Sequence, residues 1–152
     1  MNLSFTVHGV PVPQGSKRAL VHRSTGRAVV IEQGGARHRD WRADVKAAAR
    51  VEMLDHFTPP DHSLLAGPVG VSICFTVPKP KSAPKTRRTW PDRRPDLDKL
   101  VRTVLDAITG EVIADDAQVV DLQAHKRYAG DDDAMSRPGC GVMVWQVEAD
   151  HG

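Results

Sequence analysis

Two different hydrophobic periodicities follow one another in the middle of this chain and constrain its fold class more than any other feature. Apolar residues alternate with small or polar ones over residues 69–77, as in a strand with one buried face. Over 97–109 they recur three and four residues apart, as in an amphipathic helix. Between them, 78–95 contains five prolines, which interrupt helices and strands alike. We therefore expect a strand, a long loop and a helix in that order.

Similar patterns predict the remaining elements. Alternation indicates strands over 3–7, 118–128 and 141–147, and a short hairpin with strands at 19–22 and 28–31. A second helix is expected over 36–56, with an apolar side formed by Trp41, Val45, Ala48, Val51 and Leu54. With 152 residues the default is one domain, 1–152. The predicted fold is α/β (α+β), a mixed β-sheet with flanking helices and a mobile basic loop at about 78–95.

Composition limits the classes of function. The hydrophobic and charged fractions, 40% and 26%, are typical of a globular protein, and the net charge of +2 means that any nucleic-acid site depends on uneven placement of charge. Cys74 and Cys140 lack the spacing of a disulfide framework or zinc site. No membrane span, signal peptide or glycine-rich nucleotide loop is recognisable. These features predict a cytoplasmic protein without a membrane partner or a nucleotide cofactor.

Four carboxylates mark the start and the far end of the helix predicted at 97–109. Asp96 and Asp98 lie on either side of its amino terminus, and Asp115 and Asp116 follow the helix after a tight connection. We expect the chain to fold back and bring the two pairs together. Converging carboxylates repel one another unless a cation lies between them, and oxygen donors without histidine or cysteine suit Mg²⁺, with Mn²⁺ as a substitute. Taken singly, Asp96 would be a helix N-cap and Asp115–Asp116 a turn.

A basic run precedes the acids and suggests a polyanionic substrate. Its members are Lys79, Lys81, Lys85, Arg87, Arg88, Arg93 and Arg94. Lys17 and Arg18, in an earlier proline-containing loop, and Lys99 are further candidates for phosphate contact. Trp90 has two interpretations: it stacks on an unpaired base, or it pins the loop against the protein. A metal site beside a phosphate-binding loop is what a metal-dependent nuclease needs.

Arg102 and Lys126 are the cations predicted to stabilise the transition state of phosphodiester hydrolysis. Arg102 is four residues after Asp98, so the two side chains share one side of the helix. Lys126 has the parity of Val120, Leu122 and Ala124, so its stem is expected to follow the buried face toward the carboxylates. The alternative is a lysine at the end of a strand that extends its amine into solvent.

At these residues the sequence resembles the RusA family of Holliday junction resolvases, found in phages, prophages and bacteria. The matching motifs are R-P-D-L-D-K-L at 94–100, V-L-D-A-I at 104–108, A-D-D-A-Q-V-V-D-L at 114–122, and Lys126. The opening strand and V-P-V-P-Q-G-S-K-R at 10–18 are also similar to the family. Together these stretches cover about half of the chain.

The resemblance implies a homodimeric, Mg²⁺-dependent endonuclease that makes paired symmetric nicks in four-way DNA junctions during recombination or repair. Asp96, Asp98 and Asp116 would be its metal-binding catalytic acids, with Asp115 adjacent. Two positions depart from the family: Lys99 stands where asparagine is common, and Arg102 stands where the family has a lysine. Arginine retains the charge but does not release a proton, so phosphate stabilisation is the role it can keep.

Two other functions remain open at this stage. A branched-DNA-binding protein without catalysis could retain the acids as a metal-stabilised structural element. A metal-dependent phosphohydrolase acting on nucleotides is less well supported, because no glycine loop appears and the basic loop is long for a small substrate.

Overall fold

A computed structural model of the chain describes residues 2–15, 17–21, 25–32, 35–56, 63–148 and 150. Its centre is a four-stranded sheet in the order β1 (Asn2–His8), β6 (Gly139–Gln146), β4 (Val69–Val77) and β5 (Val119–Tyr128). The β4–β5 pair is parallel and the other two pairs are antiparallel, so the sheet is mixed, as predicted. The outer edge of β5 pairs with no strand of the described chain.

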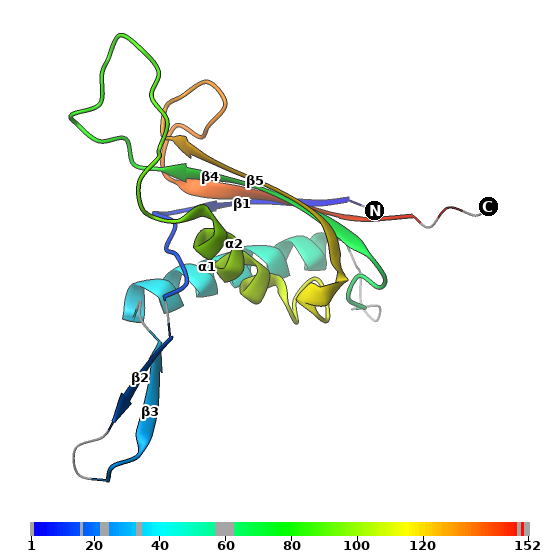
Figure 1. The fold of residues 1–152 in the computed structure, drawn as a ribbon. Coiled ribbons are helices and arrows are strands. Elements are labelled where there is room, and N and C mark those ends of the chain that lie inside the picture. The colour runs from blue at the N-terminus through cyan, green and yellow to red at the C-terminus, as the bar shows by residue number, and fades with distance from the viewer. Residues whose placement is uncertain are drawn as a thin grey trace.

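Two helices, α1 (Gly35–His56) and α2 (Leu97–Ile108), cover one face of this sheet (Figure 1). Because β4 and β5 are parallel, the chain must return between them, and α2 makes that return. A short 3₁₀ helix, η1 (Asp116–Gln118), then leads into β5. Both predicted helices and the single α+β domain architecture are confirmed.

The predicted hairpin is also present. β2 (Lys17–Val21) pairs antiparallel with β3 (Ala28–Glu32), and the pair projects away from the central sheet (Figure 1). Gly26 in the connection has a φ of +67°, which glycine adopts without steric cost.

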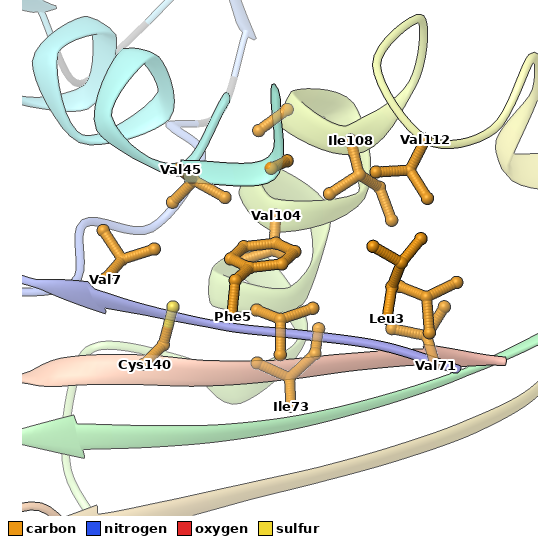
Figure 2. Packing of buried hydrophobic residues seen from close by; sticks show 14 of the residues in the cluster. Leu3, Phe5, Val7, Val45, Val71, Ile73, Val104, Ile108, Val112 and Cys140 are labelled. Carbon is orange, nitrogen blue, oxygen red and sulfur yellow. The ribbon is translucent and has the colours of Figure 1, made fainter. Parts of the chain in front are cut away.

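The core lies between the helices and the sheet (Figure 2). Leu3, Phe5 and Val7 of β1 point toward the helices, as the alternating burial of that strand predicts. Val104 and Ile108 of α2 face them and are fully buried. Burying one such side chain contributes about 1.5–3 kcal/mol, so this interface holds α2 in place on the sheet. Thr103 of α2 adds a buried polar contact, 3.2 Å between its Oγ1 and His38 Nε2 of α1.

The apolar side predicted for α1 is partly wrong. Val51 and Leu54 are 58% and 52% exposed. The residues that α1 buries are His38, Trp41, Val45, Ala49 and Met53. These positions recur every three or four residues along one line of the helix, and Val51 and Leu54 lie off that line. Ala49 with Met53, and Val51 with Leu54, both offer apolar side chains along the helix, and the position of the sheet determines that the first pair is buried.

No helix of the described residues covers the opposite face of the sheet (Figure 1). Gly70 of β4 is required there, because a Cβ at this position would come within 2.1 Å of the Trp145 ring. Both cysteines are free, and burial raises the pKa of the Cys140 thiol to about 12. Among the described residues, no helix is long and apolar enough to cross a membrane.

Candidate active site

The first acidic pair lies at the start of α2. Asp96 is the N-cap residue, with extended backbone angles, but its side chain makes no capping hydrogen bond. Its Oδ2 is 3.7 Å from Lys99 Nζ, in an ion pair exposed to solvent. Asp98, in the first turn, is exposed and forms no ion pair with a described residue. The predicted N-cap position of Asp96 is confirmed. Both carboxylates are nevertheless exposed to solvent, and neither caps the helix.

Lys126 of β5 reaches the segment that leads into this helix. Its Nζ donates hydrogen bonds to the backbone carbonyls of Arg93 and Pro95, each at 2.7 Å. In the strand register Lys126 stands beside Phe75, so its stem runs on the helix-covered face, as predicted. The amine therefore contacts the residue preceding Asp96 rather than a carboxylate. This geometry makes Lys126 a residue that positions the start of α2.

The second acidic pair lies at the start of η1, and its two members differ. Asp115 accepts a hydrogen bond from Ala117 N at 2.9 Å, and the Gln118 side chain bonds back to Asp115 N in a capping box. The Gln118 amide also donates to the carbonyls of Leu65 and Gly67, just before β4. Asp116 is exposed, and its carboxylate has no hydrogen bond or ion pair within the described chain. Asp115 thus has a structural task, and Asp116 is free for another.

The expectation that the two pairs converge within one chain is wrong. α2 has 12 residues and so spans about 18 Å, with Asp98 at one end and the turn to Asp115 beyond the other. Along β5, Val119 and Lys126 are seven positions apart, about 23 Å. Lys126 contacts Pro95, whereas Gln118 contacts Leu65 before β4. The pairs therefore occupy opposite ends of the β4–α2–β5 unit, because that unit runs the full length of the sheet.

The donor chemistry still suits a hard divalent cation. Asp96, Asp98 and Asp116 offer exposed carboxylate oxygens, the ligands that Mg²⁺ and Mn²⁺ prefer. Within the described residues, however, no group of three or more aspartate, glutamate, histidine or cysteine side chains is close enough to hold a metal ion. Within one chain, two of the four predicted acids lie at the start of α2 and the other two lie beyond its far end.

The basic loop 78–95 packs against a turn of three aspartates, 131–133. Arg88 bonds to Asp133, and Arg127 Nε donates to the other carboxylate oxygen of Asp133 at 2.8 Å. Lys79 Nζ lies 3.5 Å from Asp131. The hydrogen bonds from Arg127 and Arg88 hold the pKa of Asp133 below its ordinary value. Sequence reasoning missed this role for the acidic turn; three successive acids were the available signal, but their distance along the chain from the basic loop hid the pairing.

Trp90 lies in the same network. The guanidinium carbons of Arg88 and Arg127 lie 4.0 and 4.9 Å from the centroid of its ring. These contacts favour the interpretation in which the tryptophan pins the loop, although 53% of the residue remains exposed. A depression of about 420 Å³ opens beside it, lined by parts of 80–93 and by Tyr128.

The other predicted phosphate-binding residues fall into two groups. Lys81, Lys85, Arg87, Arg93 and Arg94 are exposed in the loop, and their side chains make no ion pair with the described residues. Lys17 and Arg18 lie in β2, and their side chains are outside the described part of the structure, so their DNA contact stays a prediction. Arg102 is exposed one turn after Asp98.

At the far end of α2, α1 is tied to the following turn. Arg50 makes a two-pronged contact with Glu111, at 2.7 and 3.1 Å, and Lys46 Nζ lies 3.7 Å from the same carboxylate. The hydrogen bond from Arg50 lowers the pKa of Glu111, which is 13% exposed. Lys46 and Arg50, two basic residues of α1, therefore have a structural partner in Glu111.

Comparison with known proteins adds a family. The family model described as "Endodeoxyribonuclease RusA" matches residues 9–134, a region that includes both acidic pairs, the basic loop and Lys126. The chain is also similar to the uncharacterized protein YqaN of Bacillus subtilis (strain 168). The two are 27% identical over 157 aligned positions, which cover 97% of this chain and 98% of that protein.

Proposed function

The chain belongs to the RusA family of endodeoxyribonucleases, and we propose that it resolves four-way DNA junctions by paired symmetric nicks in the presence of Mg²⁺. Membership of this family implies Holliday junction resolvase activity. The observation that carries the proposal is the pair of exposed carboxylates, Asp96 and Asp98, beside a loop rich in unpaired lysine and arginine. Nucleases of this family generally need a divalent metal, and Mn²⁺ is expected to substitute for Mg²⁺.

In this proposal Asp96 and Asp98 of one chain hold the metal together with Asp116 of a second copy, because the two acidic pairs lie too far apart within one chain. A metal ion bound by carboxylates polarises the scissile phosphate and lowers the pKa of an attacking water. Asp96 is available because the first turn of α2 forms without its side chain. Asp98 lies at the positive end of the helix dipole, which stabilises its negative charge. Asp115 supports the site through the capping box that fixes the backbone at Asp116.

The cations have separate proposed tasks. Arg102 is exposed and one turn from Asp98, and its task in this proposal is to stabilise the negative charge of the transition state. Lys126 holds the carbonyl groups of Arg93 and Pro95, so it fixes the entry of the chain into α2. The end of the basic loop and the first acid of the site are thereby held as one unit.

The exposed loop cations bind the DNA backbone. Each phosphate neutralised by lysine or arginine releases counterions, so binding is expected to weaken steeply with salt. Arg87 and Arg88 form a matched pair for testing this, because Arg88 contacts Asp133 and Trp90 whereas Arg87 contacts no charged partner in the described chain. Arg87→Gln should reduce the slope of log K against log salt by about 0.9 and leave stability unchanged. Arg88→Gln should also lower the unfolding temperature. If Arg87→Gln and Arg88→Gln change the salt slope and the unfolding temperature equally, the two arginines do not differ in role.

The paired nicks follow from symmetry. A four-way junction has an approximate two-fold axis, and a two-fold dimer can place one active site on each of two opposed strands. Recombination and repair, including that of phage DNA, are processes that need such an activity.

A synthetic four-way junction tests the proposal directly. Purified protein with Mg²⁺ or Mn²⁺ should produce symmetric nicks, whereas EDTA should abolish them and linear duplex or fork DNA should be cut less. The competing function is a branched-DNA-binding protein that retains the acids without catalysis. Binding to the junction without nicking under both metals would sink the endonuclease proposal and favour that alternative.

A further inference from the structure

We propose that the space between the basic loop and the acidic turn 131–133 is a site for a backbone phosphate of DNA, and that in the free protein the turn holds the cations of this site until the phosphate displaces it. This inference rests on the proposed function, because it concerns how the loop binds DNA. It begins from the cations that already have partners, Lys79, Arg88 and Arg127, rather than from those that are free.

A cavity of about 270 Å³ lies between the loop and the turn. Four cationic residues of the loop line it, Lys79, Lys85, Arg87 and Arg88, and residues 130–132 line it from the turn. A water molecule occupies about 30 Å³ in the liquid, so the space can hold several waters or one phosphate group. Lysine and arginine are the side chains that bind phosphate oxygens most strongly. The cavity therefore has the size and the donors of a phosphate site.

The turn offers these cations the same type of partner as a phosphate does. Arg88 and Arg127 donate hydrogen bonds to different oxygens of Asp133. The Asp131 carboxylate lies 3.5 Å from Lys79 Nζ and 3.8 Å from Arg88 Nε. Guanidinium groups bind carboxylates and phosphates with the same paired geometry. Asp133 therefore competes with DNA for Arg88 and Arg127.

These ion pairs are weak enough to be exchanged. The side chains of Arg88 and Asp133 are 36% and 45% exposed. Exposed ion pairs contribute little to stability, because water and salt screen them. The Asp131 side chain is only 9% exposed, yet its Oδ2 has no hydrogen bond with the described residues. A buried acceptor without a donor is unfavourable, so this oxygen adds no strong bond that a phosphate would have to break.

The loop depends on these contacts more than the turn does. Within the turn, Asp131 N donates to Tyr128 O and Ala134 N donates to Asp131 O, so its backbone is held without the loop. Over 79–92, every hydrogen bond or ion pair between the described loop and the rest of the protein is made with Asp131 or Asp133. The loop can therefore leave the turn while the turn keeps its own hydrogen bonds.

Junction binding in EDTA, where no metal supports cleavage, tests the site. Asp133→Asn should bind a synthetic four-way junction about three- to tenfold more tightly than wild type at low salt, because Arg88 and Arg127 are released. The gain should shrink as the salt concentration rises, since salt weakens the same ion pairs in the wild-type protein. Asp132→Asn is the matched control. It removes the same charge from the next residue, which makes no ion pair with a described residue, so its gain should be smaller.

A double-mutant cycle assigns the gain to the contact itself. In an Arg88→Gln background, Asp133→Asn should raise the affinity less than it does in wild type, because one of the cations it releases is already gone. Asp132→Asn should give the same small gain in both backgrounds. Equal gains from Asp132→Asn and Asp133→Asn would leave only a general effect of charge and would overturn the inference. Weaker binding by Asp133→Asn would also overturn it, because the turn would then prepare the loop for DNA rather than compete with DNA.

Trypsin gives a readout that needs no DNA. Cleavage after Lys81, Lys85 and Arg87 should be faster in Asp133→Asn than in wild type, because the loop has lost an attachment. In Asp132→Asn the rate should be unchanged. An equal rate in wild type and Asp133→Asn would show that the turn does not hold the loop, against the inference.

These readouts separate the failure of the inference from the failure of the proposed function. A chain whose Asp133→Asn variant binds junctions more tightly, but which makes no nicks with Mg²⁺ or Mn²⁺, loses the resolvase function and keeps the phosphate site. A chain that makes paired nicks, but whose Asp132→Asn and Asp133→Asn variants bind junctions alike, keeps the resolvase function and loses the phosphate site.

Discussion

The two ends of α2 each carry two nearby aspartates, and the fold uses them differently. At the start, Asp96 occupies the N-cap position without a capping hydrogen bond, and Asp98 is exposed. At the far end, Asp115 is bound into a capping box and only Asp116 is uncommitted. One end therefore has two acids available for a ligand, and the other has one.

A carboxylate in a motif is available for chemistry only when the local backbone does not need it as a hydrogen-bond partner. At η1 three residues must form a helical turn with few internal hydrogen bonds, and Asp115 supplies one of the missing partners. α2 has 12 residues, buries Leu100, Val104 and Ile108 completely, and forms without such help. Core packing therefore stabilises α2 without a cap from the Asp96 side chain, whereas η1 depends on the Asp115 side chain as its cap.

The largest expected effect tests the acids that both ends leave free. Asp98→Asn and Asp116→Asn should each reduce junction cleavage by about 10²- to 10³-fold, the scale on which the loss of one electrostatic contact to a transition state acts. Junction binding should be unchanged or tighter, because one negative charge facing the phosphates is gone. Single-turnover cleavage and gel-shift titration measure the two quantities. Retained cleavage would remove the residue from the catalytic set.

Lys126 tests whether the start of α2 must be positioned. Lys126→Met should cost about 1–3 kcal/mol of stability, since two backbone carbonyls lose a charged donor, and cleavage should fall with it. Lys85→Met, at an exposed loop lysine, is the control and should leave the unfolding free energy unchanged. Cleavage lost at unchanged stability would instead assign the Lys126 amine to the phosphate.

The capping difference predicts opposite phenotypes for neighbouring residues. Asp115→Ala should destabilise the protein by about 1 kcal/mol, the usual cost of losing an N-cap, and reduce cleavage only in proportion. Asp116→Ala should change stability by less than about 0.5 kcal/mol and lose cleavage. Chemical denaturation of both variants beside the junction assay checks this. If both lose equal stability, the two acids share one structural role.

The smallest effect concerns pH at the far end of α2. Because the folded-state pKa of Glu111 is lowered below its ordinary value of 4.5, its contact with Arg50 stabilises the fold above pH 4.5. That contribution is lost as the pH falls from 4.5 through the folded-state value. The Arg50 side chain is 61% exposed, so the loss should stay under about 1 kcal/mol. Denaturation between pH 3 and 6 should show a flatter profile for Glu111→Gln; an identical slope would show that the pair contributes nothing.

Much of the fold could be predicted because its signals are local. Alternation identified β1 and β4, and the three-and-four spacing identified α2 to within a residue of its observed end. The helix α1 was predicted in place but with part of the wrong face buried. That error arose because two apolar stripes were available, and the choice between them depends on the sheet, which is distant in sequence.

The candidate site was predicted in its residues and not in its arrangement. The sequence by itself determined the acids, the basic loop and the family, because these depend on residue identity and spacing along the chain. That the two acidic pairs lie at opposite ends of α2 became evident from the three-dimensional arrangement. Because β4 and β5 are parallel, the helix between them must return along the full length of these strands. That return places Asp116 at the opposite end of the sheet from Asp96 and Asp98.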